Sequence, residues 1–135
     1  MKPYSKEQST ISAKTYREVY LKNYCKKNKY NAKTIFYNGR KYDSRLEANF
    51  AEELDWRIDA GEIKEVIPQH KIELRGLFGE RVCNYFIDFK VINADDSITY
   101  YEVKGMKTQL WILKWKLTVQ QIAIDEPGSE LVIIR

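Results

Sequence analysis

Two residue types that often mark a known class of protein are scarce in this sequence. Only two of its 135 residues are cysteines, Cys25 and Cys83, and they lie 58 positions apart. This is not the spacing of a zinc site, and without a secretion signal we expect free thiols rather than a disulfide. The only histidine is His70, and a lone histidine on an expected strand is more often an ordinary surface residue than a catalytic base.

Long apolar runs are also absent. No stretch approaches the length that spans a membrane, and the first residues are polar, unlike the apolar core of a signal peptide. We therefore expect a cytoplasmic protein with no membrane partner. A length of 135 residues suits one domain with its own core.

Basic residues are concentrated at the start of the chain. The net charge is +4, but residues 1–41 contain eleven Lys/Arg and two Glu, a balance of +9, whereas residues 42–135 contain twelve Lys/Arg and seventeen Asp/Glu, a balance of −5. A basic arm ahead of a mildly acidic body indicates an anionic polymer as partner, nucleic acid first. A solubilising tail is the alternative.

We assign residues 1–30 to this arm, partly disordered or helical, and residues 31–135 to the folded body. Residues 24–30 (YCKKNKY) interleave aromatic residues with lysines, so that phosphates could contact the lysines while unpaired bases stack on the tyrosines. A plain exposed segment has the same pattern. The candidate phosphate-binding residues in this part of the chain are Lys26, Lys27, Lys29 and Lys33.

The body shows a clear succession of elements. Asn38-Gly39 predicts a type I′ hairpin, Ser44 a helix start, and Gly61 a helix end. Pro68 favours an edge strand or a bulge, and Thr108 can cap a second helix. The expected elements are a hairpin over 34–42, a helix over 44–60, strands over 65–74, 82–92 and 98–103, a helix over 108–124 and a strand over 131–134.

Each expected helix has an apolar stripe with helical spacing. In the first helix the stripe is Glu47, Phe50, Ala51, Leu54 and Ile58. Two interpretations of Glu47 are open: it completes a capping box with Ser44, or it is a carboxylate of a functional site. In the second helix we expect a core stripe of Leu110, Leu113, Leu117 and Ile124, widened by Trp111, Trp115 and Ile122.

The two central strands are joined by a polar turn, Asn93–Ser97. Cys83, Tyr85, Ile87, Phe89 and Val91 alternate along the first strand, which places Asp88 on the opposite face. Glu102 and Lys104 share one face of the second strand. A turn with an odd number of residues sets Asp88 on that face too, whereas an even turn sets it behind the sheet. In the odd case two carboxylates repel each other and favour a divalent cation.

Asp88, Glu102 and Lys104, on a strand–turn–strand unit, resemble the D…ExK signature of the PD-(D/E)XK nuclease superfamily. The upstream Ser44-x-x-Glu47-Ala48 resembles the first-helix motif of its phage-encoded and Holliday-junction-resolvase-like members. The resemblance spans roughly residues 32–124. Ile87 departs from it, because it stands where the proline that gives the family its name would be.

The resemblance implies a Mg²⁺-dependent deoxyribonuclease, with Mn²⁺ as a substitute. Catalytic residues would be Glu47, Asp88, Glu102 and Lys104, and metal ligands Asp88, Glu102 and the carbonyl of Val103. It also implies DNA recombination or processing, in a host cytoplasm if the protein is phage-encoded, and a symmetric homodimer. Further nucleic-acid contacts are expected from Gln69, Lys107 and Lys114, for which a solvated surface is the alternative.

The order of elements predicts an α/β (α+β) protein with a mixed β-sheet flanked by helices on both faces. This is the restriction-endonuclease-like layout of that superfamily. Three functions remain open: an endonuclease acting on branched, Holliday-junction or linear DNA, a non-catalytic nucleic-acid-binding module, or a phage or mobile-element assembly protein that uses the fold as a scaffold.

Overall fold

Asn38 and Gly39 form the turn of a short hairpin in the computed structural model, which describes residues 34–135. Both residues have positive φ, 47° and 75°, as a type I′ turn requires. The turn joins β1 (Ile35–Tyr37) to β2 (Arg40–Tyr42) in a two-stranded antiparallel sheet. The predicted hairpin is confirmed, whereas the predictions made for the arm over 1–30 and for Lys33 lie outside the described residues.

Helix α2 (Arg45–Asp59) begins and ends where the sequence predicts. The Ser44 hydroxyl accepts a hydrogen bond from the Glu47 N–H at 3.1 Å, which caps the first turn. At the other end Gly61 has a φ of 77°, and its N–H donates to the Ile58 carbonyl at 2.9 Å, as in a Schellman ending. One member of the expected stripe is wrong: Ile58 is exposed, and Ala48 is buried with the rest.

The main sheet has four strands in the order β3-β4-β5-β6. Its members are β3 (Ile63–Arg75), β4 (Arg81–Asn93), β5 (Ile98–Val103) and β6 (Glu130–Ile134). The first three pair antiparallel and β6 pairs parallel to β5. Helix α3 (Gln109–Asp125) forms the crossover between these two parallel strands. The predicted mixed α/β sheet and the predicted order of elements are confirmed.

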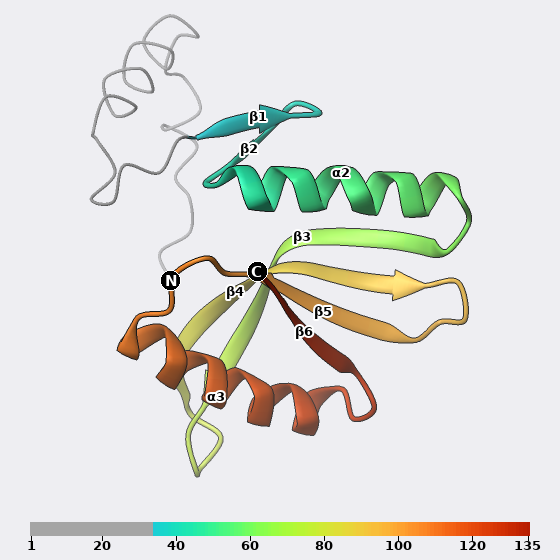
Figure 1. Cartoon of the computed structure of the whole chain (residues 1–135). Coiled ribbons are helices and arrows are strands. Elements are labelled where there is room, and N and C mark those ends of the chain that lie inside the picture. The colour runs from blue at the N-terminus through green and yellow to red at the C-terminus, as the bar shows by residue number, and fades with distance from the viewer. Residues whose placement is uncertain (1–33) are drawn as a thin grey trace, which may run out of the picture. The chain divides into compact units, whose positions relative to one another are not determined.

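Helices α2 and α3 lie on opposite sides of the sheet, as Figure 1 shows. Two groups of buried side chains result. The α2 cluster consists of Tyr42, Ala48, Phe50, Ala51, Leu54, Ile63, Phe89, Val91 and Tyr101. The α3 cluster consists of Ile72, Leu74, Tyr85, Ile87, Tyr100, Trp111 and Ile122.

Alternate residues of β4 do not all face the same helix. Tyr85 and Ile87 belong to the α3 cluster, whereas Phe89 and Val91 belong to the α2 cluster. The expectation of one apolar row with Asp88 behind it is therefore wrong. The row changes partner at Asp88, so this carboxylate lies where the two cores meet.

The change of partner coincides with an irregularity on the neighbouring strand. Gln69 has a φ of 49°, a left-handed conformation that is uncommon for a residue with a side chain. The β3–β4 ladder pairs Pro68 with Phe89 and His70 with Ile87, so the register is kept while Gln69 and Asp88, which lie between these pairs, are left out of it. Because β3 is an edge strand, Pro68 is tolerated there, as its sequence position predicted.

Helix α3 buries only part of the apolar face that its sequence predicts. Thr108 caps it as predicted, accepting from the Trp111 N–H at 3.1 Å. Of the residues expected to widen the stripe, Trp111 and Ile122 are buried as predicted and Trp115 packs partly buried against them, and Thr118 and Gln121 are buried as well. The predicted core stripe is exposed: Leu110, Leu113, Leu117 and Ile124. Among residues 34–135, no helix has both the length and the apolar character needed to cross a membrane.

Candidate functional site

The turn between β4 and β5 has an odd number of residues and sets the register of the site. Ile92 pairs with Ile98, and the Asn93 N–H donates to the Ser97 carbonyl at 2.9 Å, which leaves residues 94–96 as the turn. Asp96 takes a positive φ of 67°, as the last residue of a three-residue hairpin loop commonly does. The same register, continued past Phe89 and Tyr101, sets Asp88 opposite Glu102.

Asp88 holds the two strands together where their regular pairing ends. Its Oδ2 accepts a hydrogen bond from the Val103 N–H at 2.7 Å, and its own N–H donates to Glu102 Oε2 at 3.4 Å. A side chain thus takes the place of a ladder bond, and the Asp88 and Glu102 carboxylates become neighbours. The Val103 backbone lies beside Asp88, where the resemblance implied a ligand.

Gln69 joins a third carboxylate to this pair. Its Nε2 donates to Asp88 Oδ1 at 3.2 Å and to Glu47 Oε1 at 3.3 Å. The unusual φ of Gln69 aims the amide at both acids. Backbone strain of this kind is commonly found at functional sites.

Glu47 makes only half of the capping box that the sequence allowed. Its N–H donates to Ser44, but its carboxylate accepts from Gln69. The side chain is buried, and this burial raises the pKa of its carboxyl. A hydrogen bond from the Asp43 backbone opposes the rise, whereas the negative charges of Asp43 and Glu102 add to it. Glu47 therefore belongs spatially with Asp88 rather than only with the helix end.

Glu102 is buried and held by two aromatic side chains. Its Oε1 accepts from the Tyr85 hydroxyl at 2.7 Å and from Trp111 Nε1 at 3.1 Å. Trp111 Nε1 also donates to the Tyr85 oxygen at 2.9 Å. The apolar patterns of the sequence predict core positions for both aromatics but not these contacts. The available signal was chemical: buried tyrosine and tryptophan usually need a polar partner.

The three carboxylates have neutral hydrogen-bond partners, and none of the ion pairs found within residues 34–135 involves them. Burial raises the pKa of Asp88 to about 7, and the charges of Glu102 and Glu47 add to this effect. Burial, the Glu102 hydrogen bond and its charge also raise the pKa of Tyr85. The cluster is thus rich in negative charge for a partly buried position, and a cation would relieve it.

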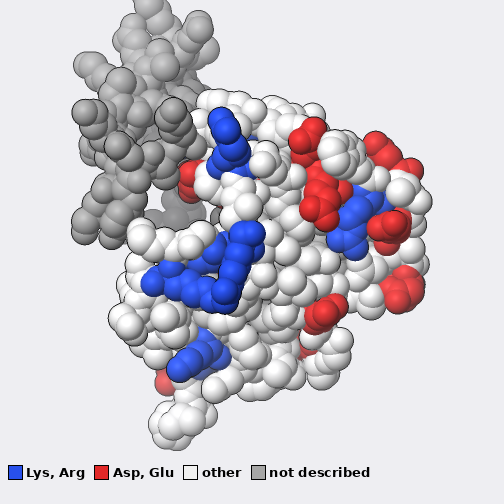
Figure 2. Space-filling model, in the orientation of Figure 1, with Lys and Arg blue, Asp and Glu red and all other residues white. Residues whose placement is uncertain are grey.

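Positive charge lies close by, at the start of α3. Lys104 Nζ and Lys107 Nζ each lie 5.8 Å from the centre of the Trp111 ring, which itself contacts Glu102. Figure 2 shows Lys and Arg side chains gathered mainly on the side where α3 begins, and Asp and Glu mainly toward the β4–β5 turn. Lys114 is half-buried one turn beyond Trp111. Lys26, Lys27, Lys29 and Lys33 are not among the described residues.

The donor set fits a hard divalent cation. Each carboxylate oxygen has two lone pairs, so hydrogen bonds to Asp88 and Glu102 leave acceptor positions free. Among the described residues there is no group of three or more His, Cys, Asp or Glu side chains arranged to enclose a metal. Mg²⁺ does not require one, because it is usually bound through one or two carboxylates and keeps several waters.

The fold and the site together define an α/β domain in which Glu47 of α2 lies close to the Asp88 and Glu102 pair of the central hairpin. The chain belongs to the family described as "Protein of unknown function (DUF1064)", which matches residues 27–124. This range includes Glu47, Gln69, Asp88, Glu102 and Lys104. A search of curated proteins gives no match.

Proposed function

We propose that the protein is a Mg²⁺-dependent DNA endonuclease of the PD-(D/E)XK type, acting in DNA recombination or processing. The observation that supports this most is the opposition of Asp88 and Glu102 across antiparallel strands, where neither carboxylate forms an ion pair with another of residues 34–135. Lys104 follows Glu102 by two residues and contacts the same ring, Trp111, that donates to Glu102. Two acids and a lysine near one ring are the residue types that phosphodiester hydrolysis uses, and this combination supports the proposal.

Asp88 and Glu102 would hold the cation, with the Val103 carbonyl as the further ligand that the resemblance implies. When bound, the cation supplies charge neutralisation at the phosphate and activation of water. The chain's own groups do the rest. Lys104 orients the attacking water and stabilises the charge that develops on the phosphate, and Gln69 fixes Asp88 in place through its 3.2 Å bond.

DNA is the favoured substrate because of the distribution of charge. Lys104 and Lys107 lie beside the acidic cluster, and eleven Lys/Arg occur in residues 1–41. Phosphate contacts of this kind position a nucleic acid without reading its sequence. They are compatible with branched DNA and with linear duplex.

A second candidate is a nucleic-acid-binding module in which the acidic cluster is structural. One observation favours it: Glu102 Oε1 is already shared between Tyr85 and Trp111, as expected for a buried carboxylate that secures α3 to the sheet. In that case DNA would bind equally well with and without a divalent cation.

The test is a cleavage panel of four-way, flap and linear DNAs with Mg²⁺ or Mn²⁺, comparing the wild type with Asp88→Asn. Asp96→Asn is a matched control, because it removes the same charge from an exposed turn of the same hairpin, and asparagine tolerates the positive φ there. We expect cleavage to be lost only in Asp88→Asn, while DNA binding persists. Cleavage by Asp88→Asn at the wild-type rate would refute the assignment, and cation-independent binding without cleavage would support the second candidate.

A further inference from the structure

The exposed face of α3 is too apolar to be explained as a solvated surface. Leu110, Leu113, Leu117 and Ile124 expose 63%, 57%, 42% and 75% of their surface. They follow helical spacing, so they form one stripe, which we call the α3 stripe. Isolated exposed apolar residues are normal, but a contiguous patch marks an interaction site.

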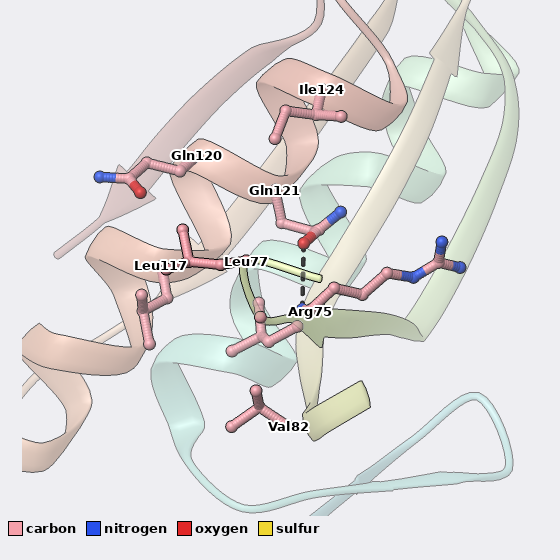
Figure 3. Close-up of a pocket in the computed structure, with 9 residues that line it drawn as sticks. Arg75, Leu77, Val82, Leu117, Gln120, Gln121 and Ile124 are labelled. Carbon is pink, nitrogen blue, oxygen red and sulfur yellow. Dashed lines mark hydrogen bonds between the residues drawn. The ribbon is translucent and has the colours of Figure 1, made fainter. Parts of the chain in front are cut away.

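The α3 stripe continues onto the turn between β3 and β4. A groove is lined by Leu117 and Ile124 on the helix and by Leu77 and Val82 on the hairpin. Figure 3 draws these side chains, with Leu117 and Leu77 between Ile124 and Val82, and with the Gln121 amide oxygen accepting from the Arg75 N–H. With Phe78, the stripe and turn expose on the order of 900 Å² of mainly apolar surface, about what one partner buries in a standard interface.

The spacing of the stripe is that of a helix that packs against another helix. Leu110, Leu117 and Ile124 are seven residues apart, and Leu113 and Gln120 fall between them. This is the a/d pattern of a coiled-coil seam, which buries its apolar residues against a parallel or antiparallel partner.

The stripe is also symmetric about its centre. Leu110 and Ile124 lie at equal distances from Leu117, seven residues before it and seven after it. If two copies of α3 cross antiparallel at Leu117, Leu110 of one copy meets Ile124 of the other, and Leu113 meets the turn that contains Gln120 and Gln121. A two-fold contact requires a surface that is complementary to itself in this way.

We propose that the α3 stripe is a homodimer interface, in which two copies of α3 pack antiparallel about a two-fold axis at Leu117. The groove beside Leu117 then contacts the α3 stripe of the second copy. In the dimer the two acidic clusters are related by the same axis. This inference does not depend on the proposed nuclease activity, so Asp88→Asn should remain dimeric.

The first test is the mass of the full chain by sedimentation velocity up to about 100 µM, since a dimer forms by mass action. We expect a species of twice the chain mass of 16.0 kDa. Leu117→Glu places two carboxylates at the axis and should raise the dimer dissociation constant at least about 100-fold. Ala123→Glu is the matched control: it adds the same charge to the same helix at an exposed position off the stripe, and should remain dimeric.

A second variant tests the axis without removing the contact. In a chain carrying Cys25→Ser and Cys83→Ser, Leu117→Cys should cross-link to its own copy under a mild oxidant, because only facing residues bring cysteines within bonding range. Ala123→Cys should not cross-link. Circular dichroism shows whether each variant is folded.

Three results would overturn the proposal. They are a wild-type chain that is monomeric throughout, a folded Leu117→Glu that dimerises as the wild type does, and a Leu117→Cys that fails to cross-link. If the wild type is monomeric, the α3 stripe is not a homodimer interface, and a different protein or residues 1–33 of the same chain would be its partner.

Discussion

Asp88 and Glu102 stand opposite each other on β4 and β5, and the Asp88 N–H donates to Glu102 Oε2 at 3.4 Å. The two acids are therefore held by their strands, not by flexible loops. Sites on rigid strands keep their geometry better than sites on loops. Because the Asp88 and Glu102 carboxylates are close and partly buried, their negative charges repel each other, and this repulsion has measurable consequences.

The first consequence is a dependence of folding stability on pH when no cation is present. The pKa of Asp88 is about 7 in the folded protein, against an ordinary value of 3.8. Between these values the folded chain holds a proton that the unfolded chain has lost, so the free energy of unfolding should fall as pH rises. We expect wild-type melting temperature in EDTA to fall from about pH 4 to pH 7, by an amount worth at most a few kcal/mol.

Asp88→Asn should flatten this dependence and raise the melting temperature near neutral pH. Asp96→Asn, in the exposed turn, should leave the slope unchanged. If Asp88→Asn melts with the wild-type slope, Asp88 is not the group that carries the repulsion.

Glu47→Gln separates the two roles that the sequence left open. If Glu47 serves only the helix start, the substitution should be nearly silent, because glutamine suits a capping box as well as glutamate does. Its contact with Gln69 points to the site, so we expect single-turnover cleavage to fall roughly ten- to a thousand-fold. Stability without a cation should stay level or rise slightly. Full activity would assign Glu47 to the cap.

Tyr85→Phe tests whether the aromatic pair positions Glu102. The substitution removes the hydroxyl that donates to Glu102 and accepts from Trp111, and loss of one partner from a buried hydrogen bond costs about 1–3 kcal/mol. We expect weaker Mn²⁺ binding, measured by calorimetry, in addition to lower stability.

Tyr37→Phe is the control for this prediction. It removes a tyrosine hydroxyl bonded to Asp55 at 2.9 Å, away from the site, and should lower stability without changing Mn²⁺ affinity. Equal Mn²⁺ affinity in both variants would mean that Tyr85 is purely structural.

The basic arm should determine how DNA affinity depends on salt. Substituting Lys26, Lys27 and Lys29 by Ala should make the slope of log affinity against log salt shallower by about 0.9 for each lost phosphate contact on duplex DNA. Lys64→Ala, at an exposed position paired with Asp96, should leave the slope as it is. An unchanged slope in the triple variant would make the arm a solubility tail.

The sequence by itself determined the elements and their ends. Asn38-Gly39, Ser44, Gly61 and Thr108 mark boundaries through local backbone chemistry, which neighbours in the chain settle without help from the rest of the fold. The odd β4–β5 turn is local in the same sense. The sequence therefore allowed two arrangements, with Asp88 on the same face of the sheet as Glu102 or on the opposite face, and the structure has the first.

Only the tertiary structure decided which faces are buried and which residues complete the site. Helix α3 has large apolar residues on several sides, so its sequence does not say whether the stripe through Leu117 or the face with Trp111 meets the sheet. In the folded protein the face with Trp111 packs against the sheet, and the Trp111 indole N–H therefore reaches Glu102. Likewise no pattern along the chain records the positive φ of Gln69, or that its amide would join Glu47 to Asp88. Such contacts depend on where distant segments meet, and that is fixed only when the layers pack.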